Sequence, residues 1–291
     1  MFTDHNRDAV RRMYESDEAL RVRQETHELY SSPAQDYLAW VLSCVHWRGD
    51  ERILDIGCGR GTWYTRLIER HPNIQYVGLD LFDGMLENHP LRTHVSVADA
   101  AHLPHPDATF DVVMANHMLF HVPDMNAVVT EIRRVLKPDG LMMAATNSLH
   151  NLPELQVLFR RAITLLTPAG SAVGLMPLYN DAFTLESGTR LLSRHFYGVV
   201  RYDIPGTFVF PSVDPVLAYI ESTRSLREPL LPPGIDWDEV MLIIREQVNR
   251  LVEHFGELVM NKLAGVLVAT DSGDFVAGYV EHLNRLAGKS S

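Results

Sequence analysis

Short apolar runs alternate with helical patterns between residues 50 and 147. In the stretch that follows Asp124, apolar residues recur with a period close to 3.6, which places them on one face of a helix. The runs between such stretches have the length of buried strands, and strands separated by helices predict βαβ units in a mostly parallel sheet. Five strands are predicted in this part of the chain, at 52–55, 75–80, 93–98, 110–115 and 141–145.

The pattern of apolar and polar residues changes on either side of residues 50–147. Two helices are predicted before the first strand, one over about 7–29 and a second that opens at Ser31-Ser32-Pro33, with serine as cap and proline in the first turn. Turn chemistry in Lys137-Pro138-Asp139-Gly140 predicts a break before the fifth strand. Beyond Thr146 the pattern predicts helices at 152–166, 236–255 and 275–286, a loop at 167–180, and strands at 199–203 and 263–270.

A loop of alternating glycines follows the first predicted strand. The stretch Asp55-Ile56-Gly57-Cys58-Gly59-Arg60-Gly61 joins an apolar strand to a helix. Glycine lets the main chain turn sharply and lets a ligand approach its N–H groups. The third glycine comes one residue too early for the usual dinucleotide loop, and an acid precedes the first one. By itself the pattern fits either a ligand-binding loop that departs from the dinucleotide spacing or a strand-to-helix turn with nothing bound.

Two further acids follow strand ends. Asp80 closes the second predicted strand, where one carboxylate can accept hydrogen bonds from both hydroxyls of a ribose. Asp99, in Ala98-Asp99-Ala100, follows the third strand and can accept from an exocyclic adenine amine. Taken singly, each acid is equally compatible with an ordinary turn.

Together, these features resemble the class I S-adenosylmethionine-dependent methyltransferases. The acid and three glycines, the acid that ends strand two, the Asp99-Ala100 step and the Val135–Gly140 turn occur in the family's order, over roughly residues 35–147. The resemblance implies an α/β fold with a doubly wound, mostly parallel seven-stranded sheet whose last strand is antiparallel. It also implies S-adenosyl-L-methionine as cofactor.

The resemblance assigns roles to individual residues. The glycines would approach the methionine part of the cofactor, Asp80 the ribose, and Asp99 with Ala100 the adenine. The residues implied to bind the cofactor are Asp55, Gly57, Gly59, Gly61, Asp80, Leu81, Asp99, Ala100 and Asn116.

Two histidines follow the fourth strand and are candidates for proton transfer. Imidazole titrates in the range that general base catalysis needs. If the segment is helical, His117 and His121 lie on one face, and His117 is favoured because it is nearer the strand end. Without an intervening glutamate or a cysteine cluster, the pair does not favour a metal site.

Four parts are expected along the chain. They are N-terminal lid helices at 1–50, the cofactor-binding core at 51–147, a cap at 148–190 and a C-terminal part at 191–291 that completes the sheet. Taken one by one, the apolar residues of the cap and its neighbours are expected to be ordinary core residues, but together they favour a pocket for a small organic acceptor: Tyr14, Tyr30, Trp63, Met176, Leu178, Tyr179 and Phe183.

Composition narrows the partners. The formal net charge of −11 over 291 residues disfavours a nucleic acid. No apolar run is long enough to span a membrane, and Cys44 and Cys58 are expected to be reduced thiols in a cytoplasmic protein. The expected partner is a small-molecule substrate methylated on O, N or C, and the chain could form a homodimer. A cofactor-binding scaffold, regulator or cyclase, and an NAD-dependent oxidoreductase, stay open as alternatives.

Overall fold

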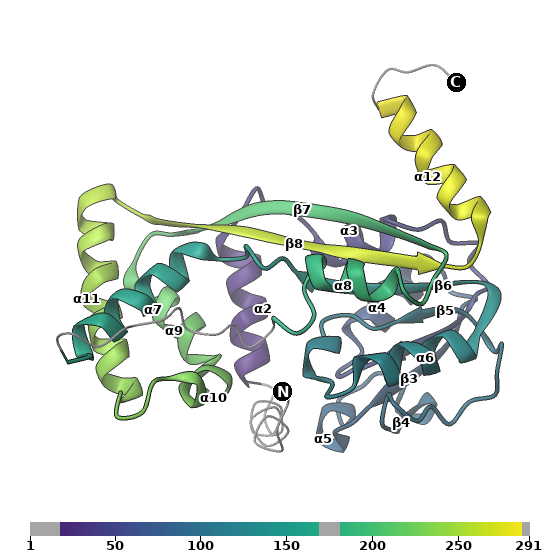
Figure 1. Cartoon of the computed structure of the whole chain (residues 1–291), viewed down its shortest axis with the longest axis horizontal. Helices are drawn as coiled ribbons and strands as arrows, with labels where there is room; N and C mark the ends of the chain where they lie inside the picture. The colour runs from purple at the N-terminus through teal and green to yellow at the C-terminus, as the bar shows by residue number, and fades with distance from the viewer. Residues whose placement is uncertain (1–17, 169–180, 287–291) are drawn as a thin grey trace. The chain divides into compact units, whose positions relative to one another are not determined.

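A computed structural model describes residues 18–168 and 181–286 of the chain. Its strands form one mixed sheet in the order β1-β7-β8-β6-β5-β2-β3-β4, drawn in Figure 1. The doubly wound α/β class predicted from the sequence is confirmed, with β6 and β8 antiparallel. The sheet has eight strands rather than seven, because the two-residue strand β1 pairs with β7.

The strands are β1 (Ser31–Ser32), β2 (Arg52–Ile56), β3 (Gln75–Asp80), β4 (Val95–Val97), β5 (Phe110–Met114), β6 (Leu136–Asn147), β7 (Gly198–Phe210) and β8 (Leu258–Thr270). The helices are α2 (Glu18–Tyr30), α3 (Tyr37–Ser43), α4 (Thr62–Arg70), α5 (Asp83–Leu86), α6 (Met125–Val135), α7 (Pro153–Leu166), α8 (Leu185–Leu192), α9 (Val213–Glu221), α10 (Arg224–Arg227), α11 (Trp237–Phe255) and α12 (Gly273–Leu286), with 3-10 turns η1 (Arg92–His94), η2 (Leu119–His121) and η3 (Glu228–Leu230).

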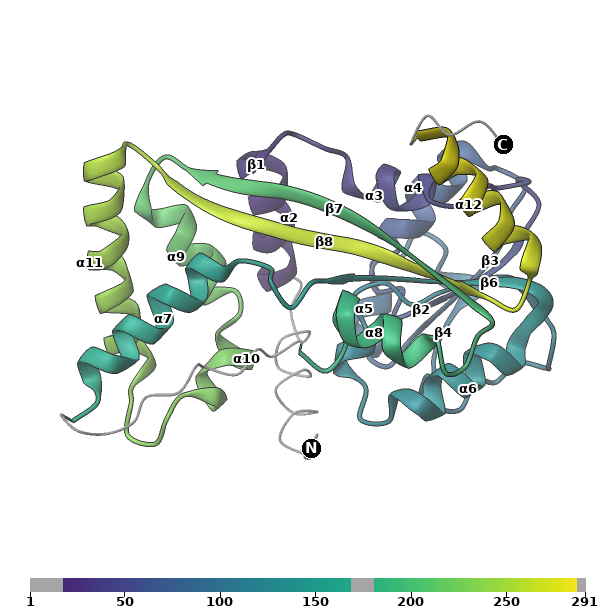
Figure 2. The same ribbon diagram turned by 45° about the horizontal axis from the view of Figure 1, so that its top comes forward.

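The chain folds into two compact units. Unit 1 comprises Met1–Gln35, Leu149–Asp181 and Ile204–Leu263, and unit 2 comprises Asp36–Ser148, Ala182–Asp203 and Ala264–Ser291. Two of the unit boundaries, at 203/204 and 263/264, fall inside β7 and β8, the two long neighbouring strands that are easiest to follow in Figure 2.

Unit 2 contains the parallel part of the sheet. Alternate strand residues such as Ile53 and Met114 pack with α3 and α4 in one buried cluster. The apolar face of α6, predicted from its 3.6-residue period, is buried through Val128, Ile132 and Val135. Burial of both faces explains why these strands are apolar at almost every position.

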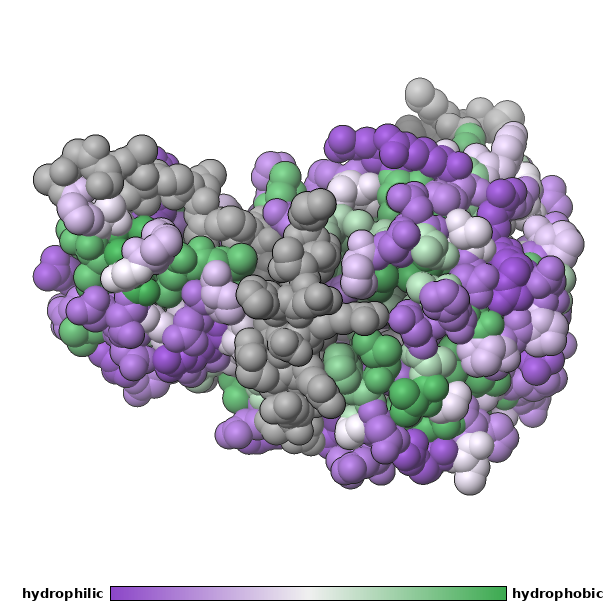
Figure 3. Space-filling view, turned by 60° about the horizontal axis from the view of Figure 1, so that its bottom comes forward, coloured by the Kyte–Doolittle hydropathy of each residue, from purple (hydrophilic) through white to green (hydrophobic). Residues whose placement is uncertain are grey.

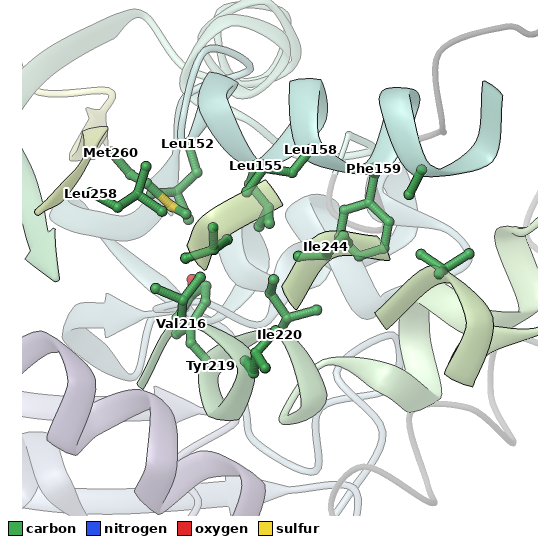
Figure 4. Packing of buried hydrophobic residues seen from close by; sticks show 14 of the residues in the cluster. Leu152, Leu155, Leu158, Phe159, Val216, Tyr219, Ile220, Ile244, Leu258 and Met260 are labelled. Atoms are coloured by element: carbon green, nitrogen blue, oxygen red, sulfur yellow. The ribbon is translucent and has the colours of Figure 1, made fainter. Parts of the chain in front are cut away.

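Unit 1 has a hydrophobic core of its own. Residues of α7, α9 and α11 interdigitate there, among them Phe159, Ile220 and Ile244, none of them measurably exposed; Figure 4 shows this packing. The indole N–H of Trp237, which is buried in the same core, donates to Glu221 at 2.9 Å. The face in Figure 3 mixes polar and apolar residues, as is normal for a folded surface.

The N-terminal expectation needs correction. Ser31 and Ser32 do not cap a helix but form β1, opposite Phe208 and Thr207 of β7. The helix begins only at Tyr37, where the Asp36 carboxylate accepts from the N–H of Ala39. Pairing with a strand some 175 residues away in sequence thus overrides a local capping signal.

A second correction concerns the turn before the fifth predicted strand. Residues 137–140 lie within β6, which pairs with β5 from Leu136 onward through a register shift. The later strands are also longer than predicted, since β7 and β8 continue from unit 2 into unit 1. None of the helices in residues 18–168 and 181–286 has the length and apolar character that crossing a bilayer requires.

Candidate active site

The glycine loop lies at the carboxyl end of β2. The N–H groups of Gly57 and Cys58 both donate to the carbonyl of Leu79 on β3, at 2.7 and 3.0 Å. Gly57, Gly59 and Gly61 have φ values of 71°, 52° and 79°, a region that disfavours residues with a side chain. The loop therefore requires glycine for its backbone as well as for any approach by a ligand.

Neighbouring side chains also occupy the space beside these glycines. A Cβ atom on Gly57 would lie 2.8 Å from Cβ of Met118, and one on Gly61 would lie 2.6 Å from Nε2 of His89. The glycine pattern thus reflects tight packing within the protein, which the sequence alone could not distinguish from ligand approach.

Asp80 ends β3 beside the loop. Its carboxylate accepts from the N–H groups of Gly59 and Phe82, both at 3.0 Å. Burial raises the pKa of Asp80, while these N–H groups act in the opposite direction. A carboxylate has about four acceptor sites, so Asp80 can still accept from ligand hydroxyls.

Asp55 is held in a buried polar cluster. Its Oδ2 accepts from the hydroxyl of Tyr76 at 2.7 Å, and its Oδ1 is buried with no partner in the described part of the chain. Burial raises the pKa of Asp55 to about 7. Nδ1 of His89 accepts from the N–H of Leu91, so the neutral ring carries its hydrogen on Nε2, 3.5 Å from the Tyr76 hydroxyl.

Asn116 and His117 follow β5, next to β2 in the sheet. The Asn116 side-chain oxygen accepts from the N–H of Ala145, whereas its Nδ2 is buried without a partner among the described residues. The N–H of His117 donates to the carbonyl of Ala145, and φ of His117 is 54°. A non-glycine residue in the left-handed region is uncommon and is typical of functional sites.

The His117 ring has a partner that sequence reasoning missed. Its Nε2 lies 2.8 Å from the hydroxyl of Tyr37, the first residue of α3. Burial lowers the pKa of His117 to about 4 and raises the pKa of Tyr37 above its ordinary value. At neutral pH the ring is therefore uncharged and the phenol protonated.

The remaining candidates lie along the same sheet edge. Asp99 follows β4 and accepts from the N–H of Ala101 at 2.9 Å, while Ala100 is buried. Leu81 follows Asp80 and is 44% exposed, which leaves its side chain available to a flat ligand. Because β2, β3, β4 and β5 are parallel neighbours, their carboxyl ends bring these residues to one edge of the sheet.

The helical arrangement considered for the two histidines is not present. His117 and His121 do not share a helix face, because only 119–121 form a short 3-10 turn and His117 precedes it with a left-handed backbone. For the described residues of the apolar set, the structure agrees with the expected core role. Trp63 and Phe183 are core residues at 8% and 1% exposure, and Tyr30 packs on the unit 1 core. Tyr14, Met176, Leu178 and Tyr179 lie outside the described residues.

Four supporting residues emerged only from the structure: Tyr37, Tyr76, His89 and Met118. Each contacts a candidate site residue that lies between 21 and 80 positions away in the sequence. The sequence features that could have indicated two of these residues are Tyr76 within the strand 75–80 and the His-Pro pair at 89–90. Neither has a spacing typical of a binding motif.

The residues present fit an adenosyl sulfonium ligand. The site offers unfilled acceptor capacity on Asp80, an unpartnered buried amide on Asn116 and an unpartnered carboxylate oxygen on Asp55. Buried polar atoms without partners are costly in a finished fold, so the two such atoms that the described residues place at this sheet edge, on Asp55 and Asn116, favour a polar ligand there.

The fold and this edge define a nucleotide-binding α/β protein of the methyltransferase type. A family model described as "Methyltransferase domain" matches residues 54–144. The chain is 30% identical over 159 residues to the demethylmenaquinone methyltransferase of Lysinibacillus sphaericus, covering 47% of this chain and 68% of the relative. It is 31% identical over 145 residues to the malonyl-[acyl-carrier protein] O-methyltransferase of Geobacter sulfurreducens, covering 47% and 54%.

A solved structure shares the fold. The phosphoethanolamine N-methyltransferase 2 of Haemonchus contortus, in complex with S-adenosyl-L-methionine, matches 94% of this chain and 61% of its own with a TM-score of 0.52 and 16% identity. The chain spans about half the length of several curated relatives that it matches, including 47% of a rifamycin-pathway methyltransferase of Amycolatopsis mediterranei. This chain belongs to the class I S-adenosylmethionine-dependent methyltransferases.

Proposed function

We propose that this protein transfers a methyl group from S-adenosylmethionine to an O, N or C atom of a small organic molecule. The observation that carries the proposal is the clustering of Asp55, Asp80 and Asn116 at the carboxyl ends of β2, β3 and β5, each with acceptor or donor capacity left unfilled. These are side chains that an adenosyl group and a charged amino acid moiety can satisfy.

Each motif residue has a part in holding the cofactor. The Asp80 carboxylate accepts from the ribose hydroxyls, the Asp99-Ala100 step and Leu81 contact the adenine, and the glycine loop with Asn116 contacts the methionine part. Bound there, the cofactor supplies a sulfonium methyl group that is already a strong electrophile. The chain's remaining task is to align the acceptor and exclude water.

His117 is proposed as the base for acceptors that carry a proton. In the tautomer with hydrogen on Nε2, the ring donates to the Tyr37 hydroxyl and Nδ1 keeps a lone pair. The pKa of about 4 makes the ring a weak base that is neutral at pH 7. Its Nδ1 would take the proton that the acceptor atom loses when that atom is methylated.

A small acceptor is favoured over a nucleic acid by the net charge of −11, which repels phosphate backbones. The cytoplasm is proposed as the location because Cys44 and Cys58 are both free thiols. A homodimer remains a prediction.

Calorimetry with S-adenosylmethionine tests the cofactor assignment first. Asp80→Asn is expected to weaken binding by roughly 1–3 kcal/mol, because a neutral amide replaces the charged acceptor. Asp83→Asn is the matched control, since Asp83 is exposed and pairs with Arg92 instead. No cofactor binding by the wild type, or equal affinity in Asp80→Asn, would contradict the site.

An acceptor screen by mass spectrometry tests the chemistry. Incubation with cofactor and a metabolite extract should produce a 14-dalton gain in at least one small molecule. Cofactor binding without any methylated product would instead support a scaffold, regulator or cyclase.

A further inference from the structure

Unit 1 contains a lysine in unusual surroundings. Lys262 lies in β8, and its ammonium group sits over the ring of Phe208, 4.3 Å from the centroid. Phe208 is fully buried, and two titratable side chains meet its ring edge-on: His27 of α2, with ring centroids 4.8 Å apart, and Tyr219 of α9, with ring centroids 5.5 Å apart. The ammonium group is thus partly withdrawn from water by aromatic surface.

Among the described residues, the polar contacts of Lys262 leave its charge without a counter-ion. Nζ donates to the hydroxyl of Ser31, and that hydroxyl in turn donates to the carbonyl of His27. Within residues 18–168 and 181–286, no carboxylate forms an ion pair with Lys262. With one N–H on Ser31 and one facing the ring, a third donor is left for a further acceptor.

The choice of lysine at this position is informative. The chain has only three lysines, Lys137, Lys262 and Lys289, and its other basic side chains, apart from histidine, are arginines. Lys137 pairs with Asp111 at 2.8 Å, as a structural lysine normally does. Burial lowers the pKa of Lys262 to about 8, which shows that its charged form lacks compensation.

We propose that Lys262 and the hydroxyl that orients it form a binding site in unit 1 for the carboxylate of a small organic ligand. A single ammonium with one spare donor matches one negative charge, supplied through one charge-assisted hydrogen bond. Phosphate carries a second charge at neutral pH, and no other described cation contacts this group to balance it. The site uses residues of unit 1 only, so it goes beyond the cofactor site of unit 2.

Nuclear magnetic resonance of the full chain labelled with ¹³C-lysine tests this directly. Three lysines give three side-chain signals, which Lys262→Arg and Lys137→Arg assign. The signals are followed over pH 6–11, in chloride and in acetate at the same ionic strength. We expect acetate to raise the pKa of Lys262 by about 1 when it is in tenfold excess over its dissociation constant, because it binds only the charged form.

Lys137 and Lys289 serve as controls within the same sample. No change at Lys262, or an equal change at all three lysines, would overturn the proposal, since the latter is general screening. A parallel titration with inorganic phosphate separates the anion classes, and a stronger response to phosphate than to acetate would overturn the carboxylate assignment.

A serine variant tests whether the hydrogen bond between Lys262 and Ser31 contributes to acetate binding. Ser31→Ala keeps the charge but removes the group that orients Nζ, and it should weaken acetate binding severalfold. An unchanged acetate response would contradict the role of Ser31. The measurement involves no methyl transfer, so failure of the proposed enzymatic function leaves its outcome readable.

Discussion

Asp55→Asn is expected to stabilise the protein relative to the wild type, and this gain in the free energy of unfolding should be larger at neutral pH than at acidic pH. Asp55 is 1% exposed, and only one of its oxygens has a partner in the described chain, the Tyr76 hydroxyl. Burial raises its pKa from 3.8 to about 7, partly offset by the Tyr76 hydrogen bond and reinforced by the charge of Asp80. Asparagine can still accept from Tyr76 but cannot ionise.

The sign and size follow from linkage. Between about pH 4 and pH 7 the folded protein keeps the Asp55 proton while the unfolded chain releases it, so stability falls as pH rises and levels off above pH 7. Each pH unit in that window corresponds to about 1.4 kcal/mol. The wild type should therefore lose up to roughly 4 kcal/mol that Asp55→Asn retains.

Urea unfolding at half-unit steps from pH 4 to 8.5 measures this difference. Tryptophan fluorescence reports on both units, since Trp40, Trp47 and Trp63 lie in unit 2 with Asp55, and Trp237 lies in unit 1. Asp139→Asn, at an exposed position, is the matched control and should follow the wild-type curve. Parallel curves for wild type and Asp55→Asn would refute the claim that burial controls this carboxyl.

Two further predictions concern the site. His117→Ala should lower turnover by about 10²–10⁴-fold with unchanged cofactor affinity. The part of the acid decline of wild-type activity that depends on His117 should lie near pH 4, where the ring takes up a proton; steady-state rates of wild type and His117→Ala from pH 3.5 to 8 check this, and a His117-dependent decline near 6.5 would count against it. Gly61→Ala should cost about 1–2 kcal/mol for the left-handed backbone at φ 79° and about 1–3 more for displacing His89. A double-mutant cycle with His89→Ala isolates the second part, and a coupling free energy of zero would contradict the contact.

Much of unit 2 could be predicted from the sequence because its signals are local. The apolar period of α6 and the strand-length runs of β2, β3 and β5 specify which faces are buried, whatever they pack against. Likewise, an acid at a strand end, such as Asp80, lies at the sheet's carboxyl edge once the strands are parallel. The family motifs add the order of these elements and the identity of the cofactor.

The partners of the motif residues could not be predicted in this way. The contacts Tyr37–His117 and Tyr76–Asp55 join residues 80 and 21 positions apart, and no periodicity encodes them. The burial that comes with this packing governs the protonation of the groups proposed for chemistry: it lowers the pKa of His117, and it raises the pKa of Asp55 against the opposing effect of the Tyr76 hydrogen bond. The sequence therefore identified candidate groups, and the packing determined their charge.

The composition of unit 1 could not be predicted from local sequence patterns. It is assembled from three separate stretches of chain, and its core joins α7 to α9 and α11. Ser31 and Ser32 carry a helix-start signal, but backbone pairing with Phe208 and Thr207 outweighs it. Amino-acid order alone determined the α/β class and the motif positions, because these depend on near neighbours. Tertiary structure decided the strand partners, the composition of unit 1 and the surroundings of Lys262, because these depend on which distant segments of the chain pack together and exclude water.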